Sequence, residues 1–321
     1  MSIFISNYAE LITNYIVFKR SLGYELSNLY HWKDIDRFLE STTNKTQDLG
    51  ITETQFYSWY QLRPNESLRN KYERACRMRS LSGYLRTLGY DSYVPDHLKN
   101  PKKTFIPYIF SKVEIETIFS VSDTIISKNA GGSKEFSSII FRILYSTGIR
   151  VGELTALKLE DVVIDGKIPH LKIRNTKNKQ DRLVPLSEST SEALKTYLRT
   201  RPIAENDFVF IDFKKSPITQ QTIYKWFREI LFASGIPHQG KGKGPRVHDL
   251  RHSFSVHSLH SMHDRGVDLY CSLPVLSKYL GHNCLSSTDM YVRLTAEMYP
   301  ELLTNMSESS KLVFPEVSDE E

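Results

Sequence analysis

Hydrophobic residues recur at helical spacing through the first hundred residues of the chain. Between residues 8 and 40 the pattern predicts two helices joined near Gly23, and a third helix is predicted to start after Thr52. Residues 65–89 predict a fourth helix, the most basic of the set, whose arginines lie on more than one face. We therefore expect a small helical domain, which we place at residues 1–100.

Residues 101–110 interrupt this helical pattern with Pro101, Pro107 and two lysines, Lys102 and Lys103. Proline disfavours helix at its own position and at the residue before it, so we interpret the segment as a basic linker between two domains.

Helical spacing resumes at Ser111, a candidate helix cap, and gives way to strict alternation after Asp161. Three alternating runs predict a small antiparallel sheet, at residues 162–164, 171–174 and 183–186. Further helices are predicted at about 188–198 and 219–234. This second domain therefore combines helices with a small sheet.

The chain is thus predicted to be mainly α with a small antiparallel β-sheet, in two domains. The predicted boundaries are 1–100 for the helical domain, 101–110 for the linker, 111–300 for the α+β domain and 301–321 for an acidic tail. No apolar run approaches the roughly 20 residues of a membrane span. The N-terminus has no basic region or small-residue cleavage site of an export signal, so we expect a cytoplasmic protein.

The net charge of +5 conceals an asymmetry. Residues 301–321 hold six carboxylates against one lysine, so the other 300 residues carry +10. Such an excess is compatible with a polyanionic partner, around which two basic domains and a basic linker could close. Arg74 and Arg77 of the basic helix are candidate phosphate contacts, and an ordinary solvated helix surface is the alternative.

A loop at residues 240–246 alternates glycine with lysine. It departs from the nucleotide-binding pattern, which needs a Ser or Thr after the lysine and a strand before it. We interpret it as a flexible basic loop that touches a nucleic-acid backbone through Lys241, Lys243 and Arg246.

The stretch that begins at His248 carries the densest candidate chemistry. Residues three apart share a helix face, so His248 and Arg251 can point at one target, and His252 could share that face. The two histidines also have the spacing of helical metal ligands, but the sequence is not His-Glu-x-x-His and no third ligand cluster is visible. We therefore expect neither a catalytic metal nor another cofactor.

The same stretch closes with His282 and Tyr291, nine residues apart. An unbroken helix would put their side chains on nearly opposite faces, so a break is needed between them. Gly281 is a candidate helix end, and Ser286 or Ser287 a candidate cap for a new helix that carries Tyr291. An arginine, histidines and a phenol can then gather in one pocket.

Five motifs in order resemble the tyrosine recombinase, or phage integrase, family. They are TGIRVGEL at 147–154, a lysine-containing turn that ends in RLVPL at 182–186, HDLRH at 248–252, LGH at 280–282, and Tyr291. The resemblance is strong over residues 111–300. It is looser over 1–100, where it implies a helical, SAM-like core-binding domain. The segment between Arg251 and Leu280 is longer than in compact members and resembles transposon-borne recombinases.

The reactive groups fit attack on a phosphodiester, which builds a second negative charge on the phosphate oxygens. Arg150 and Arg251 can present planar forks of donors to those oxygens. Glu153, three residues after Arg150, could orient it or be a surface carboxylate. Tyr291 is the candidate nucleophile, because a phenol can form a covalent intermediate, and the resemblance implies a 3′-phosphotyrosyl link.

The leaving 5′-oxygen needs a proton, for which Lys177 is the favoured donor over Lys179. Both lysines could instead contact backbone phosphates. His248 could assist proton transfer at the tyrosine, and His282 could hold a phosphate oxygen.

The resemblance implies a bacterial, DNA-associated enzyme that recombines a specific double-stranded site during integration or excision of a mobile element. It also implies a homotetramer on two DNA sites, with accessory recombinases or DNA-bending proteins as possible partners, and a tail that docks on a neighbouring protomer or is disordered. A type IB topoisomerase is the nearest alternative function. A non-catalytic DNA-binding protein is the alternative from another class.

Overall fold

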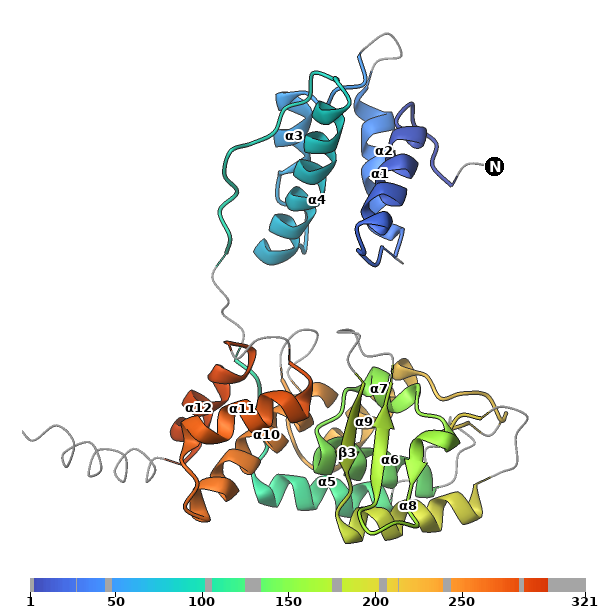
Figure 1. Ribbon diagram of the computed structural model, residues 1–321, viewed down its shortest axis with the longest axis vertical. Helices are drawn as coiled ribbons and strands as arrows, with labels where there is room; N and C mark the ends of the chain where they lie inside the picture. Colours follow the sequence, from blue (N-terminus) through green and yellow to red (C-terminus); the bar gives the residue numbers. More distant parts are fainter. Residues whose placement is uncertain are drawn as a thin grey trace, which may run out of the picture. The chain divides into compact units, whose positions relative to one another are not determined.

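The computed structural model divides the chain into two compact units. The described residues are 3–26, 28–43, 48–101, 106–124, 134–174, 181–201, 207–212, 214–238, 244–282 and 286–299. One unit spans residues 1–105 and the other 106–321 (Figure 1). Lys102 and Lys103 of the predicted linker and the acidic tail at 301–321 lie outside the described residues.

The first unit contains helices where the hydrophobic spacing predicted them. They are α1 (Ala9–Ser21), α2 (Tyr30–Thr42), α3 (Glu53–Trp59) and α4 (Leu68–Thr87). A capping box begins α3: the Thr52 hydroxyl accepts from the Gln55 backbone N–H at 3.2 Å, and the Gln55 side chain accepts from the Thr52 N–H at 2.9 Å. Side chains from the four helices share one apolar core, which includes Ile12, Ile35, Phe56 and Met78.

Arg74 of α4 supports this unit from inside. Its side chain is 8% exposed and pairs with Glu66 at 2.8 Å. Its guanidinium also donates to the backbone carbonyls of Trp59 and Gln61. Because these partners occupy the guanidinium inside the protein, the phosphate contact predicted for Arg74 is corrected to a structural role. Arg77 has a 30% exposed side chain and only a long ion pair of 3.8 Å, and its phosphate contact stays a prediction.

The second unit combines a small sheet with helices, as the sequence pattern predicted. Its helices are α5 (Lys112–Thr124), α6 (Lys134–Thr147), α7 (Val151–Thr155), the short 3-10 turn η1 (Leu159–Asp161), α8 (Glu188–Thr200), α9 (Gln220–Ala233), α10 (Val247–Asp264), α11 (Leu269–Leu280) and α12 (Ser286–Met298). In the part of the chain that the structure describes, no helix is both long and apolar enough to span a bilayer.

The sheet is antiparallel, in the order β1 (Val162–Val163), β2 (His170–Ile173) and β3 (Arg182–Pro185). Leu171 pairs with Val184, and both side chains are fully buried, so this face of the ladder joins the core. The last pair of the ladder, Ile173 with Arg182, precedes and follows residues 175–180, which lie outside the described residues.

Helix α10 connects two apolar clusters of the second unit. It packs against α6, α11 and α12 (Figure 1). Near its start, Leu250 belongs to the main core, which also holds the sheet and α9. Further along, Val256 belongs to a smaller cluster with Leu276 of α11 and Leu294 of α12. The residues at the start of α10 are thereby held beside the loops that follow α6 and α11.

Two glycines in left-handed conformation end the helices that lead to these loops. Gly148 follows α6 with φ of 60°, and Gly281 follows α11 with φ of 67°. A Cβ atom at Gly148 would overlap the Phe254 ring. A Cβ atom at Gly281 would lie 3.2 Å from Nη1 of Arg182. The helix end at Gly281 was predicted from the sequence, and the tight packing at both glycines explains why larger side chains would be excluded.

Candidate active site

Arg150 begins α7 directly after the turn at Gly148 and is fixed by Glu153. The Glu153 carboxylate accepts from the Arg150 backbone N–H at 2.9 Å and from its guanidinium at 2.8 Å. The Glu153 side chain is only 7% exposed. Burial alone would raise its pKa, but hydrogen bonds from Arg182 and Arg150 hold the pKa of Glu153 down at about 2. The carboxylate is therefore ionised and orients the Arg150 fork.

Arg182 shares the Glu153 carboxylate and was not singled out by sequence reasoning. From the start of β3, its guanidinium donates to both Glu153 oxygens, at 2.7 and 3.1 Å. Its side chain is 10% exposed and also packs against Gly281. One arginine thus joins the sheet, the start of α7 and the turn after α11. The sequence signal was its place in the RLVPL run, in which we assigned no role to the arginine itself.

Arg251 on α10 lies at the ends of two other helices and is 2% exposed. Its guanidinium donates to the carbonyl oxygen of Gly148 at 2.5 Å and of Leu280 at 2.8 Å. The carbonyls at helix C-termini carry partial negative charge, which favours a cation there. Burial, and then the nearby charge of Arg150, lowers the pKa of Arg251 to about 10, so the group remains charged at neutral pH.

No carboxylate in the described ranges forms an ion pair with Arg251. Its third partner is Nε2 of His282, 3.0 Å away. The guanidinium can only donate, so Nε2 accepts, and the His282 proton sits on Nδ1, which donates to the Thr288 hydroxyl at 2.8 Å. Burial and the charge of Arg251 lower the pKa of His282 to about 4, in keeping with this neutral form.

Tyr291 lies in the same region because α11 ends at Leu280 and α12 begins at Ser286. The predicted break between His282 and Tyr291 is confirmed. The Tyr291 side chain is 2% exposed, and its hydroxyl lies 2.9 Å from Nδ1 of His252. Burial raises the pKa of Tyr291, while the Arg251 charge acts in the opposite direction.

His248 occupies the first turn of α10 and is exposed. Its ring meets His252 edge to face, with centroids 4.8 Å apart and an interplanar angle of 88°. Packing around the ring, followed by the charges of Arg251 and Arg246, lowers its pKa even though part of the side chain stays open to solvent. From the sequence, His252 was considered only as a residue on the same helix face as His248 and, with it, as a possible metal ligand. In the structure it is the histidine that contacts the phenol.

Five further basic residues were predicted to contact DNA or to donate a proton, and the structure describes one of them, Arg246. Lys177 and Lys179, in the turn between β2 and β3, and Lys241 and Lys243 lie outside the described residues. Arg246 lies at the start of α10, where its backbone N–H and guanidinium donate to the Asp249 carboxylate at 2.8 and 3.1 Å. Its side chain is 46% exposed, so DNA contact stays a prediction for this arginine.

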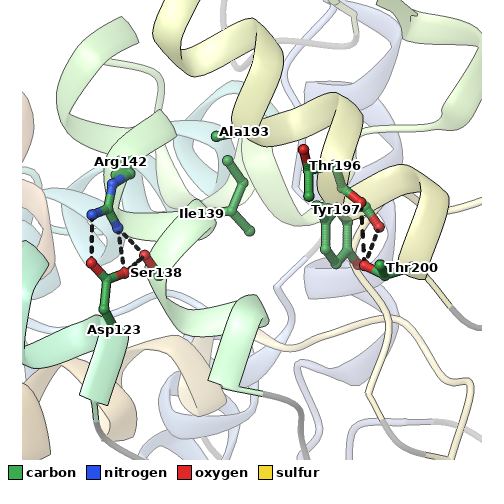
Figure 2. A pocket seen from close by; sticks show the side chains of 8 residues that line it. All are labelled: Asp123, Ser138, Ile139, Arg142, Ala193, Thr196, Tyr197 and Thr200. Atoms are coloured by element: carbon green, nitrogen blue, oxygen red, sulfur yellow. Dashed lines mark hydrogen bonds and ion pairs between the residues drawn. The ribbon is translucent and has the colours of Figure 1, made fainter.

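The second unit also has cavities. One of about 510 Å³ lies among α5, α6 and α8 and includes no predicted catalytic residue. Figure 2 shows its one labelled arginine, Arg142, already paired with Asp123, at 2.8 Å. Another, of about 320 Å³, opens beside His248 and is lined by Tyr224, Arg228 and Arg246 among others. Of these two cavities, the second one adjoins the candidate site and the first does not.

Within the described ranges, no three His, Cys, Asp or Glu side chains gather in a geometry that could hold a metal ion. The groups around Tyr291 are instead cationic and imidazole side chains. Oriented guanidinium forks beside a phenol are suited to phosphoryl transfer through a covalent intermediate. The site is therefore of the class suited to phosphoryl transfer with a tyrosine nucleophile.

Residues 109–298 match the phage integrase family model. This match covers more than half of the chain, which therefore belongs to the phage integrase family and is a tyrosine recombinase.

Individual relatives agree. The chain is 30% identical to tyrosine recombinase XerA of Pyrococcus horikoshii, over 74% of this chain and 73% of that protein. Among solved structures, the Tn1549 transposon integrase in complex with transposon right end DNA has a TM-score of 0.59 and 17% identity, over 91% of this chain and 98% of that one. A lambda integrase tetramer bound to a Holliday junction has a TM-score of 0.60 and 17% identity, over 88% and 76%. These two structures share the fold.

Proposed function

We propose that this tyrosine recombinase cleaves and rejoins DNA at a specific site, through a 3′-phosphotyrosyl intermediate formed at Tyr291. The observation that carries the proposal is the position of the Tyr291 phenol in one buried cluster with Arg251 and two histidines. Attack by the phenol oxygen forms the O–P bond, and the bond from phosphorus to the 5′-oxygen breaks. Attack of a 5′-hydroxyl on the phosphotyrosine then restores the DNA backbone.

The two arginines stabilise the charge that develops during this attack. Arg251 is buried and held by carbonyls, and Arg150 is oriented by an ionised carboxylate. Donors that are fixed before the reaction need no reorganisation when the transition state forms. Guanidinium groups also stay charged throughout, so the proposal needs neither a metal nor another cofactor.

Lys177 supplies the proton to the 5′-oxygen in this proposal. The support is its sequence position in the turn before β3, whose first residue, Arg182, touches the site. Lys177→Ala should slow cleavage of ordinary DNA strongly, and a substrate with sulfur at the 5′-bridging position should restore the rate, because a thiolate leaves without a proton. Without that rescue, the acid is another group.

The proposed substrate is double-stranded DNA, bound by four protomers at two sites, in the integration or excision of a mobile element. The transposon integrase and the lambda integrase tetramer, which share the fold and are solved with DNA, support this proposal by analogy. The basic helix α4 and the lysines outside the described residues are the proposed contacts with the DNA backbone.

A nicked suicide substrate tests the function, because loss of a short 5′-fragment prevents rejoining and traps the covalent adduct. DNA that flanks the protein's own gene is the first source of sites. Wild type should form an adduct, and Tyr291→Phe should form none while it still binds the DNA. If wild type traps no adduct on any flanking segment, the proposal fails. Relaxation of supercoiled DNA without site dependence would favour the topoisomerase alternative.

A further inference from the structure

The reacting oxygen of Tyr291 has one imidazole nitrogen beside it among the described residues. Nδ1 of His252 lies 2.9 Å from this oxygen. His252 is 8% exposed and Tyr291 2% exposed, so the pair is shielded from bulk water. Their rings are 5.7 Å apart between centroids. The contact therefore joins the proposed nucleophile to a buried group that can exchange a proton.

The surroundings of His252 keep its ring neutral. Burial, followed by the charges of His248, Arg246 and Arg251, lowers the pKa of His252 to about 3. A neutral ring with its proton on Nε2 has a lone pair on Nδ1, and the phenol O–H can then donate to it. A bound phosphodiester would bring negative charge that offsets the arginines and increases the basicity of the ring.

His248, the residue for which sequence spacing predicted this task, has a different position. It meets the His252 ring edge to face, and its side chain is exposed. His282 is also turned elsewhere, because its two nitrogens face Arg251 and Thr288. Of the three histidines, His252 is therefore the one with a ring nitrogen at hydrogen-bond distance from the phenol oxygen, at 2.9 Å.

We propose that His252 is a further catalytic residue, which takes the phenolic proton when Tyr291 attacks DNA. This inference rests on the proposed function. In the step, the Tyr291 O–H bond breaks and an N–H bond forms at Nδ1 of His252, while the phenol oxygen bonds to phosphorus. The 5′-oxygen departs with a proton from the separate acid. In rejoining, His252 returns its proton to the departing phenol oxygen.

Charged and titratable groups face His252 from three segments. They are Arg246 directly before α10, His248 and Arg251 on α10, His282 after α11, and Tyr291 on α12. A pH profile of cleavage reports on all of them together, so it is interpreted only as a difference between a variant and wild type.

The test measures covalent adduct formation in the full chain for wild type, His252→Ala and His252→Asn, with DNA binding and thermal melting followed in parallel. We expect both variants to form the adduct about 10²–10³-fold more slowly, the range of general base catalysis. The rate of His252→Ala should rise more steeply with pH than that of wild type, because hydroxide must replace the lost base. His252→Asn covers the case in which the alanine variant fails to fold.

Two substitutions of reacting groups separate a base from a merely structural residue. Replacing Tyr291 with 2,3-difluorotyrosine, a more acidic phenol, should recover at least about tenfold of the rate lost in the His252 variants. A more acidic phenol depends less on a base to remove its proton. A substrate with sulfur at the 5′-bridging position should give no recovery, because it relieves the need for the acid only.

His257→Ala is the matched control. His257 lies on the same helix, is likewise 8% exposed, and has Nδ1 at 2.7 Å from a tyrosine hydroxyl, that of Tyr145. Its substitution removes a similar histidine–tyrosine contact, whose tyrosine is partly buried, away from the reacting atoms. The adduct rate per folded molecule should therefore stay within about threefold of wild type, with no response to the fluorinated phenol.

The inference is overturned if the His252 variants react as fast as wild type, or faster, which would mean that His252 restrains the phenol. It is also overturned if the 5′-sulfur substrate rescues them, or if the fluorinated phenol does not. These outcomes leave the proposed function intact, because they require an adduct from wild type. Absence of any adduct from wild type would instead defeat the proposed function itself.

Discussion

Among the described residues, each unit of this protein has one arginine classed as buried, and the two arginines have different surroundings. Arg74 in the first unit, 6% exposed, faces the Glu66 carboxylate and two carbonyls. Arg251 in the second unit, 2% exposed, faces two carbonyls and a neutral imidazole, with no carboxylate partner in the described ranges. Arg74 is neutralised within the fold, whereas Arg251 keeps its charge available.

The comparison teaches how to separate a structural arginine from a functional one. Burying a cation is unfavourable unless its charge is compensated. In the first unit an internal anion compensates it, and the pair contributes to folding. In the second unit, carbonyl dipoles, a neutral imidazole and the more distant Glu153 charge compensate it in part, and an anion from outside would complete the compensation. A buried arginine without a carboxylate partner is therefore a candidate anion-binding group.

Arg251→Lys should have the largest effect on activity. A lysine has the charge but lacks the planar fork that reaches two carbonyls and a phosphate together, so adduct formation should fall about 10²–10³-fold. Single-turnover trapping on a suicide substrate measures this loss. Arg74→Lys is the matched variant, and its folded fraction should keep nearly the wild-type rate. An equal loss in both variants would contradict the distinction.

Arg74→Ala should have the largest effect on stability. It leaves the mostly buried Glu66 carboxylate without its guanidinium partner and with the Arg63 backbone N–H, at 3.2 Å, as a remaining donor. Removing one partner of a buried ion pair costs up to about 3–5 kcal/mol. Urea unfolding of the first unit, followed by the fluorescence of Trp59 in a variant with that tryptophan alone, measures the change. Arg77→Ala, which removes an arginine with a 3.8 Å ion pair and a 30% exposed side chain, should change stability by less than about 0.5 kcal/mol.

Mild acid should weaken the second unit before the first. Burial lowers the pKa of His252 to about 3 and of His257 and His282 to about 4. Such histidines stabilise the fold fully above their unfolded pKa near 6.5, and this contribution is lost as pH falls toward the folded values. One such histidine corresponds to about 2 kcal/mol at pH 5.

The first unit supplies the internal comparison for this acid effect. The hydrogen bonds from Arg74 lower the pKa of Glu66, so its contribution persists until the pH falls below the ordinary glutamate value. Urea unfolding at pH 7 and pH 5, with Trp226 reporting on the second unit and Trp59 on the first, should show the larger loss at Trp226. Equal losses at both tryptophans would count against the assignment of neutral buried histidines.

Thr288→Val should have the smallest effect in this series. The valine removes the hydroxyl that accepts from Nδ1 of His282 at 2.8 Å, so the ring loses the partner that fixes its orientation toward Arg251. A lost hydrogen bond of about 1 kcal/mol corresponds to a roughly fivefold slower adduct formation. Thr288→Ser keeps the hydroxyl and should react like wild type. A slow serine variant would point to packing around the methyl group instead.

Local spacing was enough to predict most of the fold, and together with the family resemblance it indicated the main groups of the site. Helical periodicity, strand alternation and the glycine at 281 are properties of neighbouring residues, and they placed Arg251 and Tyr291 in one region. Helix spacing also indicated that Glu153 could orient Arg150, and the structure contains this contact at 2.8 Å.

What the sequence did not reveal depends on contacts between distant segments. Arg182 reaches Glu153 across 29 residues, and His252 reaches Tyr291 across 39. Helix or strand periodicity relates only near neighbours in the sequence, so it identifies neither of these partners. Arg74 was misjudged for a similar reason, because a basic helix looks the same whether one of its arginines faces solvent or a carboxylate that lies before the helix begins.

The burial of Tyr291 also affects how this enzyme behaves when it is not recombining DNA. A phenol with 2% of its surface exposed is poorly accessible to dissolved electrophiles and to stray phosphodiesters. Reagents that label tyrosines should therefore modify the surface tyrosines first and leave this one largely untouched. In the structure as it stands, the candidate nucleophile is therefore shielded from groups that are not bound in the site, and substrate binding would have to bring the phosphodiester to it.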